Sequence, residues 1–489
     1  MIDKPMTQRR TKIVATIGPS SSAEEMISRL LQAGVDVFRL NFSHGATEDH
    51  VAVTRHIRRQ ARHLGRYVGI LADLQGPKIR IGGFASGAVE LHAGDPFQLS
   101  LDIEPEGGDQ RAVSVEYHEL PASVATDDIL LLDDGKLRLR VDDVTDRTVD
   151  CTVIVGGRLS SRKGVNKLGG GLAAPALTEK DLADIRSMTD IQPDFVAVSF
   201  VSSAADIEQA RTLLNDEGLS PALIAKIERA EVVADTDLLN AIIDASDGIM
   251  VARGDLGVEV GDAQLIGIQK NLISTTRKRD RLVITATQMM ESMISSPIPT
   301  RAEVSDVANA VLDGTDAVMT SAETAAGKYP AETIAAMVRV CVEVEKEDSL
   351  LQENRGGPGQ IDVENSIARA TAFTAAGLPI KAIAALTQSG RTALLMSRMA
   401  ISVPIYAMSS VIETRRRVTL FRGVHPVRFK GTRNPEKALL MAEDELIKRG
   451  VVQNGDLIVL TIGEPIGSAG GTNTLKIVKV GEHAAPEAH

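Results

Sequence analysis

Residues 223–257 begin with LIAKIERAE and end with ASDGIMVARGDLG, and each piece contains a short apolar run that stops at charged residues. In the first piece Lys226 and Glu228 are two residues apart, so an extended backbone directs both side chains to the same side. Arg253 and Asp255 repeat this spacing in the second piece. Two carboxylates together with substrate oxygens often hold Mg²⁺, whereas each charge pair alone is typical of a surface salt bridge.

The same pattern, an apolar run that ends in polar residues, occurs eight times. The runs are TKIVAT (11–16), VDVFRLN (35–41), YVGILAD (67–73), FVAVSF (195–200), LIAKIE (223–228), GIMVARGD (248–255), LVITATQ (282–288) and AVMTSAET (317–324). Helical patterns fill the intervals, as at 23–34, where Gly34 is expected to end the helix. Alternating strands and helices also occur in doubly wound open sheets. Eight units of about 30 residues favour an α/β fold of the (β/α)₈ TIM barrel type, with the polar strand ends forming the site.

Two parts of the chain depart from this pattern. Residues 77–174, here called the inserted segment, alternate with period two between turn signals, which predicts a small antiparallel β-barrel domain. It is expected to act as a lid over the barrel, with Gly169 to Gly171 as a hinge, although a passive insertion is the alternative. A Gly- and Pro-containing linker at 353–362 precedes a second α/β pattern. The expected domains are a barrel (1–76 and 175–350), the inserted segment (77–174) and a C-terminal α/β domain (351–489).

The composition restricts the class of partner. The 54 basic and 65 acidic residues give a formal net charge of −11, which argues against nucleic acid or an anionic membrane as a partner. Cys151 and Cys341 belong to no metal-binding motif, so neither a disulfide framework nor a zinc site is expected. The chain has no apolar leader and no long apolar run, and we therefore expect a cytoplasmic protein.

Seven motifs, in this order, are similar to those of pyruvate kinases. They are RLNFSHG (39–45), DLQGPKIR (73–80), AKIERAE (225–231), MVARGDLGVE (250–259), ITATQMMESMI (284–294), PTRAEVSDVANAVLDGTDAVM (299–319) and SAETAAGKYP (321–330). The resemblance covers essentially the whole chain. The motifs DLQGPK (73–78) and NKLGGGL (166–172) are similar to those of a bacterial branch of the family. It implies phosphoryl transfer from phosphoenolpyruvate to ADP, giving pyruvate and ATP at the last step of glycolysis, with Mg²⁺ or Mn²⁺ as cofactor.

Two alternatives remain beside this interpretation. One is a Mg²⁺-dependent lyase or aldolase of the barrel class that acts on an oxoacid without a nucleotide. The other is a catalytically silent barrel that binds only a sugar phosphate through its C-terminal domain. Nucleotide dependence of pyruvate formation distinguishes the first alternative from a kinase.

The resemblance also assigns roles to individual residues. Lys226 would neutralise the transferred phosphoryl group, while Glu228 and Asp255 would bind Mg²⁺. The expected catalytic residues are Lys226, Arg39, Arg80, Thr287, Ser321 and Glu323, the last two as a proton relay. The expected substrate contacts are Arg39, Gly254, Asp255 and Thr287, and the expected nucleotide contacts are Asn41, Phe42, Ser43, His44, Arg80 and Lys163. The structural alternatives are a solvated strand face for Arg80, a hydroxyl bonded to backbone for Thr287 and a purely structural role for His44.

One motif differs from the family pattern. The resemblance implies a monovalent cation site at Asn41, Ser43, Asp73 and Leu74, and members that require K⁺ carry DTKGPE where this chain has DLQGPK. Lys78 therefore replaces a glutamate. Because a fixed ammonium supplies the positive charge and repels a second cation, we expect that K⁺ is not required.

The C-terminal part contains a second expected site. The segment after the run AIAALT, with Thr387, Ser389, Gly390, Arg391 and Thr392, is typical of a phosphate-binding helix N-terminus. The resemblance implies an allosteric sugar monophosphate or AMP here, covered by a loop at 464–474, and a homotetrameric assembly. A plain helix-capping turn is the alternative.

Overall fold

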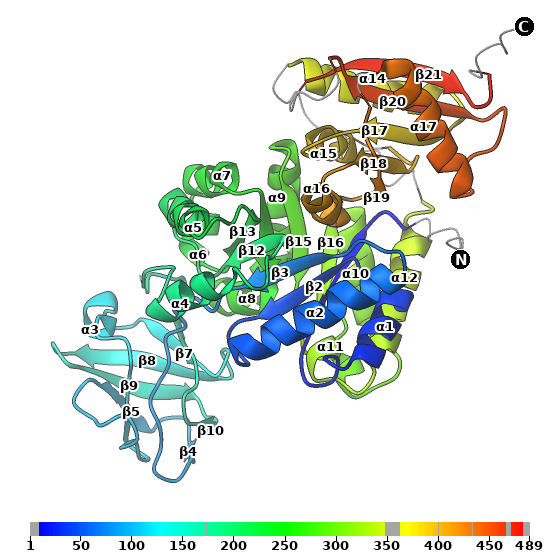
Figure 1. Cartoon of the computed structure of the whole chain (residues 1–489). Coiled ribbons are helices and arrows are strands. Elements are labelled where there is room, and N and C mark those ends of the chain that lie inside the picture. The colour runs from blue at the N-terminus through cyan, green and yellow to red at the C-terminus, as the bar shows by residue number, and fades with distance from the viewer. Residues whose placement is uncertain are drawn as a thin grey trace, which may run out of the picture.

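The computed structural model describes residues 9–172, 174–347, 362–399, 401–432, 434–465 and 471–482. Apart from Asp362, the linker expected at 353–362 lies outside these residues. Three bodies follow one another in space, with the barrel between the inserted segment and the C-terminal domain (Figure 1).

Eight parallel strands close into a barrel in the order β1-β16-β15-β14-β13-β12-β3-β2, which confirms the predicted fold class. They are β1 (Lys12–Thr16), β2 (Val37–Asn41), β3 (Gly69–Asp73), β12 (Phe195–Val198), β13 (Ala222–Ile227), β14 (Gly248–Ala252), β15 (Leu282–Ala286) and β16 (Ala317–Thr320). The register places Lys226 beside Met250 and Asn41 beside Asp73, so the polar residues that follow each apolar run meet at one end of the barrel.

Helices surround the barrel as the sequence predicted. They are α1 (Glu24–Ala33), α2 (Thr47–His63), α4 (Glu179–Ser187), α5 (Ala204–Asp216), α6 (Ala230–Ala234), α7 (Thr236–Ala245), α8 (Arg253–Val260), α9 (Asp262–Lys278), α10 (Arg301–Leu312), α11 (Ala322–Ala325) and α12 (Pro330–Val344), with a 3₁₀ turn η1 (Glu291–Ile294). Gly34 ends α1 with a φ of 120°, a backbone conformation that favours glycine, so the expected helix end is confirmed.

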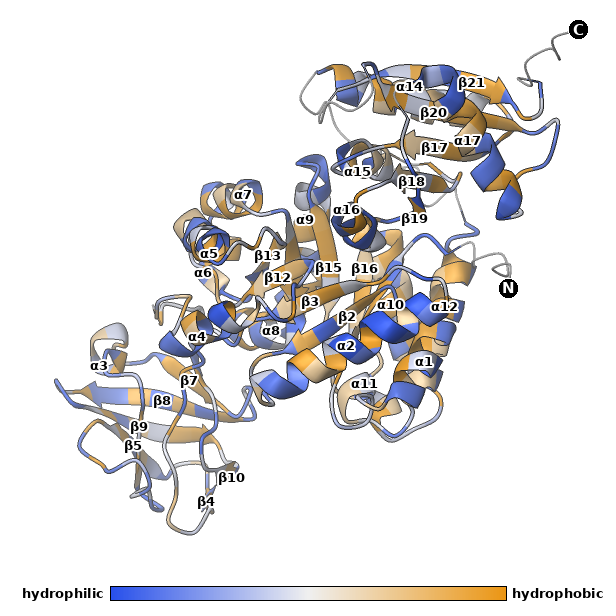
Figure 2. Ribbon diagram, viewed as in Figure 1, coloured by the Kyte–Doolittle hydropathy of each residue, from blue (hydrophilic) through white to orange (hydrophobic). Residues whose placement is uncertain are grey.

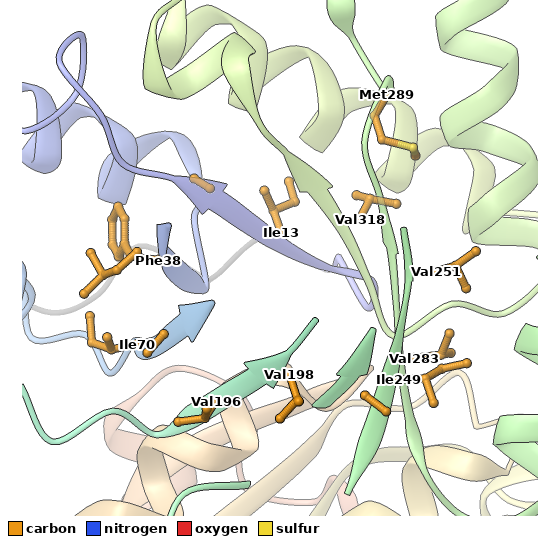
Figure 3. Packing of buried hydrophobic residues seen from close by; sticks show 14 of the residues in the cluster. Ile13, Phe38, Ile70, Val196, Val198, Ile249, Val251, Val283, Met289 and Val318 are labelled. Carbon is orange, nitrogen blue, oxygen red and sulfur yellow. The ribbon is translucent and has the colours of Figure 1, made fainter. Parts of the chain in front are cut away.

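The strands are buried on both sides, as expected of a parallel barrel. Ile13, Phe38, Ile70, Val196 and Ile249 belong to the cluster that contacts the surrounding helices (Figure 3). The side chains between them, such as Val14 and Ile224, belong to a second cluster that continues into the C-terminal domain. The helices that cover the barrel are hydrophilic on the side away from the strands (Figure 2).

The inserted segment leaves the barrel after β3 and returns before β12. It contains β4 (Ala88–Leu91), β5 (Pro96–Ser100), β6 (Ala112–Ser114), α3 (Leu120–Ser123), β7 (Ile129–Leu132), β8 (Leu137–Val144), β9 (Thr148–Val155), β10 (Gly157–Ser160) and β11 (Val165–Lys167). These strands form a six-stranded sheet, β11-β7-β8-β9-β5-β6, and a two-stranded sheet, β10-β4, around one apolar cluster. The pair β5–β6 is parallel, so the expectation of a purely antiparallel domain is wrong at this pair, because period-two patterns do not encode strand direction.

The C-terminal domain is a five-stranded sheet in the order β19-β18-β17-β20-β21, in which only β21 is antiparallel to its neighbour. Its elements are α14 (Val363–Gly377), β17 (Ile380–Leu386), α15 (Arg391–Arg398), β18 (Ile405–Ser409), α16 (Ile412–Arg417), η3 (Val418–Leu420), β19 (Val424–Arg428), α17 (Pro435–Lys448), β20 (Leu457–Gly463) and β21 (Thr472–Lys479).

A buried ion pair joins this domain to the barrel. Arg398, at the end of α15, donates from both terminal nitrogens to the carboxylate of Asp316, which directly precedes β16. Asp316 is fully buried and also accepts hydrogen bonds from the backbone N–H groups of Val283 and Arg422. The C-terminal domain therefore packs at the end of the barrel where β16 begins, opposite the polar strand ends.

Candidate active site

Lys226 lies at the centre of the polar end of the barrel. Its Nζ donates to Ser199 Oγ at 2.6 Å and lies 2.9 Å from Glu228 Oε1 and 3.3 Å from Asp73 Oδ1. Asp73 ends β3, Ser199 follows β12 and Glu228 follows β13, so three adjacent strands supply this cluster. The sequence prediction that Lys226 and Glu228 point to the same side is thereby confirmed.

Arg39 extends the cluster from β2. Its Nε donates to Asp73 Oδ2 at 2.6 Å and its Nη1 donates to Thr16 Oγ1 at 3.1 Å. The Thr16 hydroxyl in turn donates to the Thr320 carbonyl. Asp73 is thus shared between Arg39 and Lys226, which fixes the two cations on the same carboxylate.

Burial and charge set the protonation states of this cluster. Burial lowers the pKa of Lys226, but Asp73 and Glu228 outweigh it and raise that pKa above its ordinary value. Burial raises the pKa of Asp73, but Arg39 and Lys226 lower it below its ordinary value. Burial raises the pKa of Glu228, and Asp255 adds to this shift. Lys226 is therefore a cation at neutral pH, and a further cation beside Glu228 would favour the ionised form of that carboxylate.

Asp255 lies in the first turn of α8, but Arg253 does not pair with it. Strand β14 ends at Ala252, so Arg253 already belongs to the helix and its Nη1 lies 2.7 Å from Asp306 Oδ1. The two charge pairs therefore have the same spacing in the sequence but lie in different secondary structure. Lys226 is on a strand with Glu228 directly after it, whereas Arg253 and Asp255 lie on a helix.

Thr287 follows β15 and contacts the start of α8. Its hydroxyl accepts a hydrogen bond from the Gly254 N–H at 2.8 Å and donates to the Ala286 carbonyl at 2.7 Å. The structural alternative for Thr287 is thus present in the structure, and the Gly254 N–H is already used. Thr287 also has a φ of 65°, which is unusual for a β-branched residue and is typical of strained functional loops.

Four expected nucleotide contacts form a compact turn after β2. Asn41 Oδ1 accepts from the Ser43 N–H at 3.2 Å, and Asn41 Nδ2 lies 3.3 Å from His44 Nδ1. The Phe42 side chain is only 2% exposed and stacks on His50, with 4.5 Å between ring centroids. The Phe42 N–H donates to the Asp73 carbonyl at 2.9 Å and the Phe42 carbonyl accepts from Lys180 Nζ at 2.7 Å, so both backbone groups already have partners.

Arg80 and Lys163 lie in the inserted segment. Arg80 Nη1 donates to the Arg162 carbonyl at 3.1 Å, and Lys163 Nζ lies 2.7 Å from Asp133 Oδ1. Both contacts are within the inserted segment, whose sheets lie to one side of the barrel (Figure 1).

The carboxylate of Glu323 is bonded to backbone. Glu323 Oε2 accepts from the Ser321 N–H at 2.6 Å, and Oε1 accepts from the Met290 N–H at 3.2 Å. This arrangement holds the loop after β16 against the loop after β15. A role for Ser321 and Glu323 in proton transfer stays a prediction.

Lys78 connects the inserted segment with α8. Its ammonium lies 3.4 Å from Asp255 Oδ1 and 3.6 Å from Asp134 Oδ1, in the turn between β7 and β8. Burial lowers the pKa of Lys78, but Asp255 and Asp134 raise it above its ordinary value. Lys78 is therefore a fixed cation beside Asp255, one of the two expected Mg²⁺ ligands.

The second expected site forms a pocket in the C-terminal domain. Thr387, Ser389 and Thr392 line it together with Glu364 and Thr472. Gly390 has a φ of 88° and begins α15, and its N–H donates to Thr387 Oγ1 at 2.9 Å. Arg391 Nε donates to Glu364 Oε2 at 2.8 Å. Of the expected covering loop at 464–474, residues 466–470 lie outside the part of the chain that the structure describes.

Comparisons with known proteins agree with this geometry. The family model "Pyruvate kinase, barrel domain" matches residues 8–334, and "Pyruvate kinase, alpha/beta domain" matches residues 365–478. The chain belongs to the pyruvate kinase family. Pyruvate kinase II of Salmonella typhimurium is 50% identical over 96% of this chain and 99% of its own length. A pyruvate kinase of Haemophilus influenzae is 49% identical over 93% of this chain and 96% of its own length.

A solved structure supports the same conclusion for the fold. A pyruvate kinase from Cryptosporidium parvum matches with a TM-score of 0.91 and 34% identity, over 98% of this chain and 97% of that one. The chain is accordingly a glycolytic phosphotransferase of the pyruvate kinase family. No helix within the described ranges has the length and apolar character needed to span a membrane.

Sequence reasoning assigned no role to Ser199 and Thr16, although both contact the charged cluster. Each stands at or next to the end of an apolar run, which is the one signal that could have identified them. Asp73 was assigned only to a monovalent cation site, and its contacts with Arg39 and Lys226 depend on the closure of the barrel.

Proposed function

We propose that this chain transfers a phosphoryl group from phosphoenolpyruvate to ADP at the Lys226 cluster and protonates the resulting enolate to pyruvate. The observation that supports this most is the Lys226 ammonium, which two buried carboxylates hold at the polar end of the barrel next to Arg39. Phosphoryl transfer depends on positioned positive charge more than on covalent catalysis. Lys226 would neutralise the transferred group, and Arg39, with its planar guanidinium, would orient the substrate phosphate.

The donor set fits a magnesium ion. Glu228 is 1% exposed and its Oε1 lies 2.9 Å from the Lys226 ammonium, so this buried oxygen already faces one cation and has a further lone pair for a metal ion. Glu228 and Asp255 would bind Mg²⁺ together with substrate oxygens, as is common for this ion. When bound, Mg²⁺ supplies charge neutralisation at the phosphate and at the developing enolate oxygen.

The inserted segment is proposed to close over this site as a lid. Closure would bring Arg80 and Lys163 toward the nucleotide and exclude water, which competes with ADP for the phosphoryl group. The proposed domain boundaries follow the points where the chain leaves β3 and returns to α4.

Pyruvate formation that depends on ADP tests the proposed reaction. With phosphoenolpyruvate and Mg²⁺, the protein is expected to form pyruvate only when ADP is present, as followed by coupling to lactate dehydrogenase. Pyruvate formation at the same rate without ADP would instead favour a lyase acting on the same enolate chemistry.

The second testable expectation is activity without a monovalent cation. Asp73 already contacts two cations, and the Lys78 ammonium lies beside Asp255, so a K⁺ ion would gain little from this site. The wild type is expected to keep most of its rate in a tetramethylammonium buffer free of K⁺ and Na⁺. Lys78→Glu is expected to make the rate dependent on K⁺, with a loss of about tenfold or more in its absence. A wild type that stops in this buffer contradicts the proposal.

The pocket of the C-terminal domain is proposed to bind a sugar monophosphate or AMP that activates the enzyme. The N-terminus of α15 and the hydroxyl groups of Thr387, Ser389 and Thr392 suit a phosphate. Ser389→Asp places a negative charge there and is expected to raise the half-activating concentration by about tenfold or more while the unactivated rate stays unchanged. Ser389→Ala is the matched control. Equal activation of Ser389→Asp and wild type would argue against this pocket.

The remaining proposals concern assembly and location. A homotetramer is proposed on the basis of the resemblance, and light scattering of the purified protein tests it. A cytoplasmic location follows from the glycolytic role, and fractionation of cells tests it.

A further inference from the structure

The helix α8 contacts the inserted segment at both of its ends. In its first turn, Asp255 lies 3.4 Å from the Lys78 ammonium, which also approaches Asp134 of the inserted segment. In its last turn, the Glu259 carbonyl accepts a hydrogen bond from the Gly169 N–H at 2.9 Å. The helix that carries a proposed metal ligand is thus also the surface on which the inserted segment rests.

The Glu259 side chain adds a second link at the same place. It is 8% exposed, and its Oε1 accepts from Asn166 Nδ2 at 3.4 Å, on the last strand of the inserted segment. Its Oε2 accepts from the Ala230 N–H at 2.8 Å, at the start of α6. The carboxylate therefore connects the inserted segment, α8 and the loop that follows the Lys226 strand.

A neighbouring arginine secures the next part of the exit segment. Arg229 is buried, and its Nη2 donates to the Leu172 carbonyl at 2.6 Å while its Nε lies 2.6 Å from Glu231 Oε1. A small pocket remains between these contacts, lined by Lys78, Asn166, Arg229 and Glu259 among others. The exit of the inserted segment is thus attached to the barrel through side chains that lie outside the Lys226 cluster.

We propose that Glu259 is a positioning residue that fixes the exit of the inserted segment on α8 and thereby sets where the inserted segment lies over Asp255 and the nucleotide. This inference rests on the proposed phosphoryl transfer. Glu259 does not touch the reacting atoms. It acts through α8 and through Asn166, and its loss should weaken nucleotide binding more than phosphoenolpyruvate binding, because Arg80 and Lys163 move with the inserted segment.

The groups around Glu259 give this contact a pH dependence. The pKa of Glu259 is raised to about 7: burial has the largest effect and the nearby Glu231 adds to it, while the Ala230 N–H, Arg229 and Asn166 oppose the shift. Both side-chain partners are N–H donors, so the ionised carboxylate is the form that accepts from both. As pH falls through about 7 the carboxyl gains a proton, and the contact weakens.

Steady-state kinetics of three variants test the positioning role. Glu259→Ala and Asn166→Ala are expected to raise KM for ADP about fivefold to tenfold and to change KM for phosphoenolpyruvate less than about twofold. Asp102→Ala is the control, because it removes the ion pair of Asp102 with Arg147 inside the inserted segment, outside residues 165–172, and leaves the contacts of Glu259 in place. Hydrogen exchange of the peptide over 165–172 should become faster in the first two variants and stay unchanged in the control.

The pH dependence of kcat/KM for ADP distinguishes the positioning role from a simple loss of packing, which would not change with pH. Glu259→Gln keeps the size of the side chain and cannot titrate, so the ratio of wild-type to Gln-variant kcat/KM for ADP should fall as pH decreases from about 8 to about 6. Because both enzymes use the same substrates, the effect of substrate ionisation on kcat/KM cancels in this ratio. An inactive wild type would reject the proposed function, whereas an active wild type with unchanged KM for ADP in Glu259→Ala and Asn166→Ala would reject the positioning role.

Discussion

Lys226→Met is expected to lower kcat by about 10³-fold or more, since it removes the charge that we propose neutralises the transferred phosphoryl group while keeping a long apolar side chain. The loss should exceed that of a single surface charge because Lys226 is buried between Asp73 and Glu228. Without the ammonium, these two carboxylates would also repel the negative substrate. The lactate dehydrogenase-coupled assay at saturating phosphoenolpyruvate and ADP measures the effect.

Lys12→Met is the matched control for this substitution. Lys12 is also buried on a barrel strand, but it begins β1 at the opposite end of the barrel, where its Nζ donates to the Val424 carbonyl at 2.6 Å. Its substitution is expected to leave kcat within about threefold of the wild type, because it contacts no residue of the site. If both variants lose activity equally, or Lys226→Met keeps more than about a tenth of the rate, Lys226 is not the residue that stabilises the transferred group.

Asp316→Ala is expected to destabilise the protein by about 3–5 kcal/mol, because removal of one partner leaves a buried charge without compensation. Arg398 is 1% exposed and donates to both carboxylate oxygens of Asp316. Burial and the nearby Arg398 lower the pKa of Arg277 to about 9, whereas Asp316 raises it, so Asp316 compensates more than one buried cation. Urea unfolding followed by circular dichroism measures the change.

An exposed ion pair provides the comparison. Glu332 lies 2.9 Å from Arg29 on the surface, and its side chain is 45% exposed. Glu332→Ala is expected to change stability by less than about 0.5 kcal/mol, because water and salt screen such a pair. A loss below about 1 kcal/mol in Asp316→Ala would show that Arg398 finds another partner or water at the junction.

The sequence by itself determined the barrel and the chemistry of its open end. Strands in a closed parallel barrel are short, apolar and buried on both sides. Eight apolar runs that stop at polar residues therefore predict the barrel from local sequence patterns alone. The same rule placed Lys226, Glu228 and Arg39 at one end, because each lies within two residues of the C-terminal end of a strand. The glycine turn before α15 was likewise recognisable, since Gly390 adopts a local conformation that few other residues tolerate.

Only the tertiary structure decided which of these charges meet. Arg253 and Asp255 have the spacing of Lys226 and Glu228, yet a helix begins one residue after Ala252 and directs Arg253 to Asp306. The links of Glu259 to Asn166 and of Arg398 to Asp316 join residues 93 and 82 positions apart. Contacts between residues so far apart in sequence depend on how the barrel packs against the inserted segment and the C-terminal domain. They also depend on how burial changes the energy of a charged group, and local sequence patterns contain neither kind of information.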